Sequence, residues 1–74
     1  MIEHYWIHDA KKRYYRARIN IDLLGHIEII RAYGGLNSNM GRFVKDQYHC
    51  LDSANKALNG LLKRREKRGY RLVS

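Results

Sequence analysis

The sequence contains no proline and only one cysteine, Cys50. A single cysteine excludes an internal disulfide and makes a reducing compartment the default expectation. No apolar run approaches the roughly 20 residues that a membrane-spanning helix needs. The opening residues also lack the basic start and apolar run of a signal peptide. We therefore expect a cytoplasmic protein without a membrane partner, stabilised by packing alone or by packing and self-association.

Negative charge is also scarce. The 74 residues carry 15 Lys and Arg against 7 Asp and Glu, a formal net charge of +8. The excess lies in two blocks, KKRYYRAR (residues 11–18) and KRREKRGYR (residues 63–71), whereas residues 21–50 hold three acids and three bases. Such blocks favour a polyanion partner, most often nucleic acid, over charge that serves solubility alone.

Hydrophobic periodicity predicts four strands. From Arg13 to Asp22, residues alternate with a period of two, which indicates a strand with one buried face. Ile2–Asp9, His26–Tyr33 and Arg42–Cys50 also favour strands, because they contain aromatic and β-branched residues. Between the second and third strands, the sequence DLLG (residues 22–25) predicts a turn with its two leucines tucked beneath it.

After residue 51 the hydrophobic period changes to that of a helix. The apolar residues of the stripe are Ala54, Ala57, Leu58, Leu61 and Leu62. Asp52 or Ser53 is the predicted N-cap, since a short side-chain oxygen can accept from the first-turn amides. Gly69 is predicted to end the helix in a left-handed conformation. Gly60, inside the helix, is expected to mark a close contact with the sheet.

The predicted order is four strands, one helix and an extended tail, residues 70–73, that could add an edge strand. The fold class is therefore α+β: a small twisted antiparallel sheet of four to five strands with one C-terminal helix packed on one face. Residues 1–74 are expected to form a single domain. The sheet face away from the helix would stay at least partly exposed.

Three segments together resemble the WGR domain, in particular its small stand-alone bacterial versions. They are HYWIHDAKKRYYRARI, LLGHIEIIRAYGGLNSNMGR and LDSANKALNGLLKRREKRGY, and the resemblance runs from Ile2 to Tyr70. The family hallmark is a Trp-Gly-Arg triplet at a strand end, followed by a hairpin turn, a strand, and a helix whose basic end closes on Gly-Tyr. Here Tyr33 stands at the tryptophan position, Gly34 matches, and Gly35 replaces the arginine.

This resemblance implies a non-catalytic module that binds nucleic acid or docks another domain. In the DNA-dependent poly(ADP-ribose) polymerases, the domain contacts DNA near a break through its tryptophan and basic residues. The resemblance therefore favours DNA over RNA as the partner, and it implies that Tyr33 stacks on a base or sugar. With Gly35 in the arginine's place, either Arg31 or Arg42 makes the phosphate contact, or the contact is lost.

Two further groups of basic residues are candidates for phosphate contacts. Arg16 and Arg18 share the polar face of the second strand with Tyr14, joined by residues 11–13 of the preceding turn, and such basic and aromatic surfaces bind nucleic acid. The end of the predicted helix holds more cations than its dipole requires. The candidate nucleic-acid-binding residues are Arg16, Arg18, Arg31, Tyr33, Arg42, Lys63, Arg64 and Lys67.

Some of these residues have structural alternatives that the sequence leaves open. Tyr33 could cap the hydrophobic core, and Arg31 could pair with Glu28 or Asp46. Tyr70, after the helix-ending glycine, is expected to fold back onto the sheet and lock the helix terminus rather than contact a ligand.

The sequence contains no pattern that indicates catalysis. His49 and Cys50 form a bare dipeptide without the second cysteine pair of a zinc site. No glycine-rich phosphate loop precedes a helix, and the acidic residues form no recognisable acid–base pair. We therefore expect no catalytic residues, no metal and no cofactor, and interpret the protein as a non-enzyme.

The alternative hypothesis is a protein-interaction or homodimerisation module with no direct nucleic-acid role. The aromatic residues near the start of the chain, Tyr5, Trp6, Tyr14 and Tyr15, offer a surface for such contacts. The incomplete Trp-Gly-Arg triplet also fits this hypothesis. A monomer that binds DNA would favour the first hypothesis, and a tight dimer indifferent to DNA the second.

Overall fold

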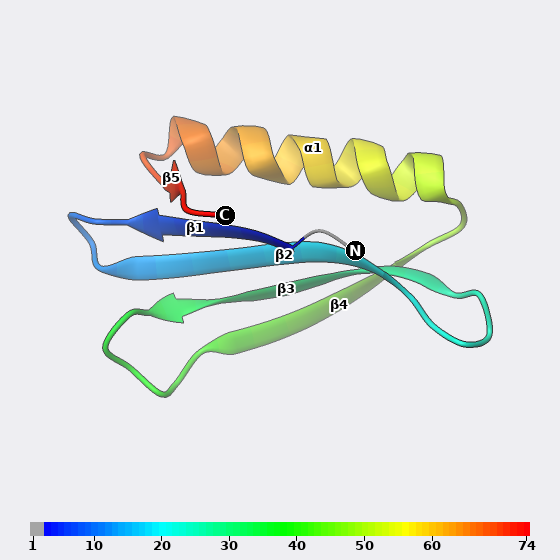
Figure 1. Ribbon diagram of the computed structural model, residues 1–74, viewed down its shortest axis with the longest axis horizontal. Coiled ribbons are helices and arrows are strands. Elements are labelled where there is room, and N and C mark those ends of the chain that lie inside the picture. Colours follow the sequence, from blue (N-terminus) through cyan, green and yellow to red (C-terminus); the bar gives the residue numbers. More distant parts are fainter. Residues whose placement is uncertain (1–2) are drawn as a thin grey trace.

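A computed structural model describes residues 3–74. Five strands form one antiparallel sheet, and a single helix packs against it (Figure 1). The elements are β1 (Glu3–His8), β2 (Arg13–Ile21), β3 (Ile27–Gly35), β4 (Arg42–Tyr48), α1 (Leu51–Lys67) and β5 (Arg71–Leu72). The order across the sheet is β4-β3-β2-β1-β5. The predicted α+β class with one C-terminal helix is confirmed, and the tail adds the fifth strand.

Strand β3 is longer than the sequence predicts. It continues beyond Tyr33, because Gly34 and Gly35 pair in register with Tyr14 and Arg13 of β2. The two glycines are therefore strand residues rather than the start of a loop. Of the predicted first strand, Ile2 lies outside the described residues.

The hydrophobic core lies between α1 and one face of the sheet. The period of two on β2 and β3 turns Tyr15, Ala17 and Ile19 toward the helix, together with Ile29. The remaining buried core residues are Trp6, Ala54, Leu58 and Leu61. Ala17 on the sheet and Ala54 on the helix are both fully buried, so small side chains allow the two layers to approach closely.

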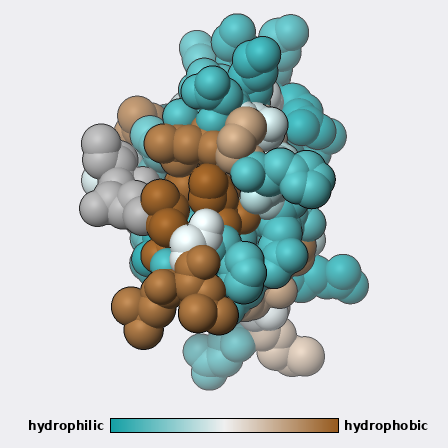
Figure 2. Space-filling view, turned by 90° about the vertical axis from the view of Figure 1, so that its right-hand side faces the viewer, coloured by the Kyte–Doolittle hydropathy of each residue, from teal (hydrophilic) through white to brown (hydrophobic). Residues whose placement is uncertain are grey.

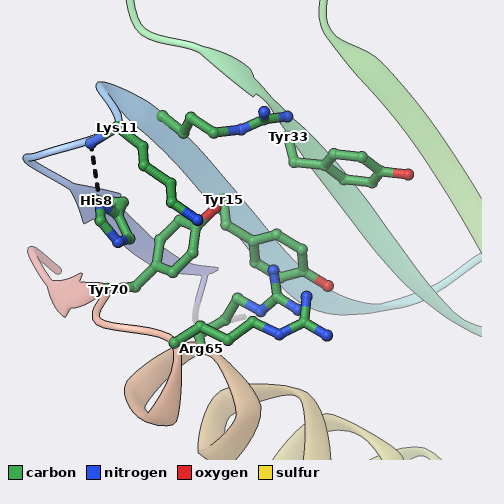
Figure 3. A pocket seen from close by; sticks show the side chains of 8 residues that line it. His8, Lys11, Tyr15, Tyr33, Arg65 and Tyr70 are labelled. Carbon is green, nitrogen blue, oxygen red and sulfur yellow. Dashed lines mark hydrogen bonds between the residues drawn. The ribbon is translucent and has the colours of Figure 1, made fainter.

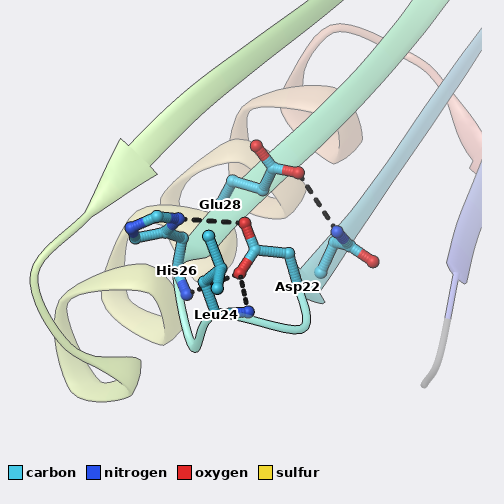
Figure 4. Close-up of polar contacts among 5 residues, drawn as sticks. Asp22, Leu24, His26 and Glu28 are labelled. Atoms are coloured by element: carbon cyan, nitrogen blue, oxygen red, sulfur yellow. Dashed lines mark hydrogen bonds and ion pairs between the residues drawn. The ribbon is translucent and has the colours of Figure 1, made fainter.

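The turn between β2 and β3 does not bury its leucines, and this prediction was wrong. Asp22 organises the turn: its Oδ1 accepts hydrogen bonds from the amides of Leu24 and His26, both at 2.9 Å (Figure 4). Gly25 adopts a φ of +83°. With the backbone held by the carboxylate, Leu24 is 83% exposed, and Leu23 is more exposed still.

The same contacts make the turn sensitive to acid. The hydrogen bond from the His26 amide, assisted by its ring, holds the pKa of Asp22 below its ordinary value. The carboxylate therefore stabilises the turn above its unfolded-state pKa, and this support is lost as the pH falls through the lowered folded-state pKa.

An apolar patch covers the end of the molecule that carries this turn. Figure 2 looks onto that end, and hydrophobic residues gather there beside the polar residues of the helix start. The exposed apolar residues of the turn and its surroundings are Ile21, Leu23, Leu24 and Leu51. We call these four residues the apolar patch.

The helix ends partly follow the sequence-based expectation. Gly69 has the expected positive φ, +89°, and the amide of Tyr70 then donates back to the carbonyl of Arg65 at 3.0 Å. The predicted N-cap is wrong: Cys50 occupies that position without a side-chain cap hydrogen bond, and Asp52 lies in the first turn. There its charge still suits the helix dipole.

Gly60 makes no close contact with the sheet, contrary to the expectation. A Cβ atom built at Gly60 would meet no atom of another element within 4 Å. Replacing Gly60 with alanine should therefore stabilise the protein by about 1 kcal/mol, because alanine restricts the unfolded chain more and favours the helix. Urea denaturation monitored by circular dichroism measures the change.

The matched control is Gly69→Ala, which should destabilise the protein because Gly69 adopts a left-handed conformation and its Cβ would approach His8 Nε2 at 3.2 Å. Loss of stability in Gly60→Ala would show that Gly60 has a packing role after all.

Candidate nucleic-acid interface

A cleft opens where the C-terminal end of α1 passes over the ends of β1, β2 and β3 (Figure 3). Its volume is about 590 Å³. The cleft is lined by His8, Lys11, Arg13, Tyr15, Tyr33, Arg65, Arg68 and Tyr70. Four of these residues are Lys or Arg, three are Tyr, and none is acidic. We call this site the basic cleft.

Strand register brings the sheet residues of the basic cleft together. Arg13 and Tyr15 are two residues apart on β2 and share a face. Tyr33 of β3 lies directly opposite Tyr15, and His8 of β1 lies opposite Arg13. The rings of Tyr15 and Tyr33 stack with centroids 5.8 Å apart and planes 18° apart. Two strands therefore supply a wall of two stacked tyrosine rings, and Arg13 and His8 extend this wall.

The opposite wall comes from Arg65, in the last turn of α1, and from Arg68, the C-cap residue just beyond the helix. The two residues continue the spacing of Leu58 and Leu61 by steps of four and three, which turns them toward the side of the helix that faces the sheet. The guanidinium carbon of Arg65 lies 4.4 Å from the ring centre of Tyr15 and 5.4 Å from that of Tyr70. Cation–π attraction thus holds the guanidinium in the cleft.

Arg65 carries an unsatisfied donor into this site. Its Nε is buried and has no hydrogen-bond partner among the described residues. Within residues 3–74, no carboxylate forms an ion pair with Arg65 or Arg68. A buried cation with unused hydrogen-bonding capacity is stabilised by an anion, which makes the basic cleft a suitable site for one.

Tyr70 closes the end of the cleft. Its ring packs edge-on against His8, with centroids 5.2 Å apart, and against Tyr15 at 6.5 Å. The Nδ1 of His8 accepts a hydrogen bond from the amide of Lys11 at 3.1 Å, which fixes the ring. Tyr70 therefore folds back and locks the helix terminus as the sequence predicts, and it also lines the cleft.

A second hollow, of about 340 Å³, continues the basic surface toward the β3–β4 loop. It shares Lys11, Arg13 and Tyr33 with the basic cleft and adds two cations, Lys12 and Arg42. The amide of Leu36 donates to the carbonyl of Lys12 at 2.8 Å, so the loop and the β1–β2 turn are joined. The two hollows form one continuous basic surface.

The glycines of the β3 end accommodate a tyrosine on the other side of the sheet. A Cβ at Gly34 would lie 3.0 Å from the Cα of Gly41, and one at Gly41 would lie 2.5 Å from the Tyr14 hydroxyl. Gly34 and Gly41 are thus small so that the Tyr14 ring can pack against the backbone. Gly35 is different, because its nearest neighbour would be Ser38 Cβ at 3.5 Å, an ordinary contact.

Of the predicted site residues, the structure brings Tyr33 and Arg42 to this surface, where they lie opposite each other in register. Tyr33 packs against the core and stacks on Tyr15, so the core-capping alternative holds for at least part of its ring. Arg31 pairs with Asp46 at 3.0 Å, which confirms its structural alternative. Arg31 therefore has its charge matched within the chain.

Arg16 and Arg18 lie on the open sheet face, away from α1. Each guanidinium lies near Glu3, at 3.8 and 3.7 Å, and that of Arg16 also lies 4.7 Å from the ring centre of Tyr5. The sequence analysis grouped Arg13 with them, but Arg13 faces the helix instead, because it lies two residues before Tyr15 and therefore points to the same side of β2. The structure therefore does not assemble Arg16 and Arg18 with the helix end.

Lys63, Arg64 and Lys67 are exposed on α1 and do not line the basic cleft. At 100° per residue, Lys63 and Lys67 lie on the side of the helix opposite Leu61 and Arg65. Sequence reasoning missed Arg65 and Arg68, although the signal was present: they continue the spacing of the apolar stripe. Sequence reasoning also grouped Lys11 and Arg13 with the face of Arg16 and Arg18, whereas both residues line the basic cleft.

Charges beside the cleft are already paired. The Nε of Arg71 donates a hydrogen bond to Asp9 at 2.7 Å. This hydrogen bond holds the pKa of Asp9 below its ordinary value and raises the pKa of Arg71. The pair ties β5 to the β1–β2 turn. Asp9, the acid nearest in sequence to Lys11 and Arg13, therefore has its charge compensated by Arg71.

Among residues 3–74, no group of three His, Cys, Asp or Glu side chains is placed to hold a metal ion. The helix of this region is too short and too polar to span a membrane. Comparisons with protein-family models, curated proteins and solved structures find no match to this chain.

Proposed function

We propose that this chain is a non-catalytic, WGR-like module that binds nucleic acid, and that its contact surface is the basic cleft with the adjoining hollow of Lys12 and Arg42. One observation carries the proposal: cations from two strands, two loops and a helix line the tyrosine-rich cleft and its adjoining hollow, and neither has an acidic lining residue. Positive charges that lie close together without acidic partners repel one another, and a bound anion removes this repulsion.

The cations of the cleft would bind phosphates of the backbone. Arginine suits this role because its guanidinium offers several donors in a planar fork. Arg65 is half-buried and held against the rings of Tyr15 and Tyr70, so a phosphate contact requires less additional ordering of its side chain. Tyr33 has one ring face on Tyr15 and therefore offers at most one to a nucleotide. Backbone contacts should thus dominate, with little sequence preference.

The resemblance to the WGR domain favours DNA as the partner, and titration of a short duplex and a single strand at two salt concentrations tests the proposal. For a duplex, the logarithm of affinity falls with the logarithm of salt by about 0.9 per phosphate contacted. With four Lys and Arg in the basic cleft and two more in the adjoining hollow, a slope of about −4 to −5 is expected. Absence of binding to both ligands at low salt would contradict the proposal.

Restoring the family arginine should strengthen binding. Gly35 lines the hollow beside Arg42, has no left-handed φ, and leaves room for a side chain. Gly35→Arg adds a donor fork at the edge of the basic surface, so the dissociation constant for duplex DNA should fall about threefold to tenfold, the effect of one exposed charged contact. Fluorescence anisotropy at low salt measures it.

The control for that variant is Gly35→Ala, which fills the same space without adding charge and should leave affinity unchanged. Equal affinity of Gly35→Arg and Gly35→Ala would show that the hollow does not face the nucleic acid.

A second candidate function, docking of another protein, is favoured by the apolar patch. Its four residues are exposed at the end of the molecule opposite the basic cleft, so both functions are compatible in one chain (Figure 1). A variant that carries both Leu23→Ser and Leu24→Ser distinguishes the two functions, because it should no longer bind the partner protein and should still bind DNA.

A further inference from the structure

The two edges of the sheet are protected very differently. One edge ends in β5, a strand of only two residues, and short edge strands resist further pairing. The other edge is β4, which has seven residues and, within residues 3–74, pairs with β3 alone (Figure 1). The chain has no proline to interrupt it. The outer backbone groups of β4 are thus a template for another strand.

We infer that the β4 edge binds a second copy of this chain, in an antiparallel pair centred on Val44. In this register Val44 meets the partner's Val44. Arg42 lies opposite the partner's Asp46, and Phe43 lies opposite the partner's Lys45. The five-residue overlap 42–46 therefore contains an apolar pair at its centre, an aromatic–cation pair on each side of it and an opposite-charge pair at each end.

The side chains of β4 already favour these contacts within one chain. Lys45 Nζ lies 5.6 Å from the ring centre of Phe43, and Phe43 is 63% exposed, so the ring retains surface for the partner's Lys45. Arg42 has no ion-pair partner among the described residues. Asp46 uses one oxygen for Arg31 and can accept a further hydrogen bond.

The registers centred on the two residues after Val44 are less favourable. Centring the pair on Lys45 or on Asp46 places a charge opposite the same charge of the partner, which is destabilising. The Val44 register also keeps residues of one face opposite residues of the same face. Both helices then lie on one side of a continuous sheet, and the two basic clefts open on that side. The dimer uses the β4 edge and leaves the four Lys and Arg residues of the basic cleft free to bind nucleic acid, whereas Arg42 of the adjoining hollow is shared by the two surfaces.

The mass of the natural chain in solution, measured by sedimentation equilibrium over a range of concentrations, tests the dimer. The mass should rise from 8.8 kDa toward twice that value. A mass that stays at 8.8 kDa at every concentration would overturn the inference.

Charge variants of the central residue test the register. Val44→Lys and Val44→Glu each place like charges face to face and should be monomeric, whereas an equimolar mixture should form a heterodimer. Val44→Thr, which keeps the branched side chain, should still dimerise. A mixture that stays monomeric while the natural chain dimerises would exclude this register.

Hydrogen exchange of the natural chain gives a measurement that needs no variant. The amides of β4 that do not bond to β3 should become protected as the concentration rises. Protection confined to other segments would place the interface elsewhere and overturn the inference.

Discussion

Replacing Arg13 and Arg68 together with alanine is expected to weaken binding to a short DNA duplex by about tenfold to a hundredfold, since each charge-assisted contact contributes about 1 kcal/mol or more. The two residues approach the basic cleft from opposite walls. The salt slope should also become shallower by about 2, one unit for each lost phosphate contact. Fluorescence anisotropy at several salt concentrations measures both quantities.

The control for this variant removes the same charge from the other side of the sheet. Arg16→Ala with Arg18→Ala also lowers the net charge by two, but both arginines lie on the open face near Glu3. That control should weaken binding by only a few-fold, through the general field of the protein. If both double variants lose the same affinity, binding follows net charge and the basic cleft is not the contact surface.

The largest effect on stability is expected from Ile29→Ala. Ile29 is fully buried on β3 beneath the helix, and it is the largest side chain in that state among the described residues. Removing its methyl and methylene groups should lower the free energy of unfolding by about 2–5 kcal/mol, through lost burial and the remaining cavity. Because a chain of this size buries a small core, such a loss should leave much of it unfolded.

Leu24→Ala provides the comparison, because leucine and isoleucine lose the same number of atoms. Leu24 is 83% exposed on the β2–β3 turn, so the change should alter stability by no more than about 0.5 kcal/mol. Urea denaturation of both variants checks the pair. A Leu24→Ala loss comparable to that of Ile29→Ala would mean that the turn packs onto the protein in solution.

The period of two and the later helical stripe were enough to predict the fold class, but Arg13, which the sequence grouped with Arg16 and Arg18, faces the helix instead. The pairing between strands was not predictable in the same way. The stack of Tyr33 on Tyr15 depends on the register of β2 with β3, which connects residues far apart in the sequence. The prediction that the leucines of the β2–β3 turn are buried was wrong for a local reason. Asp22 holds the turn by accepting two backbone hydrogen bonds, so the turn forms without a core contact from the leucines.

The candidate site was only partly predictable. The basic blocks indicated a polyanion partner, but a contiguous run of charges on a helix points in several directions. Extending the stripe of Leu58 and Leu61 would have selected Arg65 and Arg68. The convergence of that helix end on Arg13 and Tyr33 needed the sheet topology as well. Gly34 and Gly35 also differ in their surroundings, because Gly34 is packed against Tyr14 and Gly41 whereas Gly35 is unobstructed.

The central claim, that nucleic acid binds in the basic cleft, is tested most directly by a nuclear magnetic resonance titration of the natural chain with a short DNA duplex. The predicted result is that amide shifts change in residues 11–13, 33–35 and 65–70, and that the open face around Arg16 and Arg18 stays unchanged. Shift changes centred on Arg16 and Arg18, with residues 65–70 unaffected, would contradict the account.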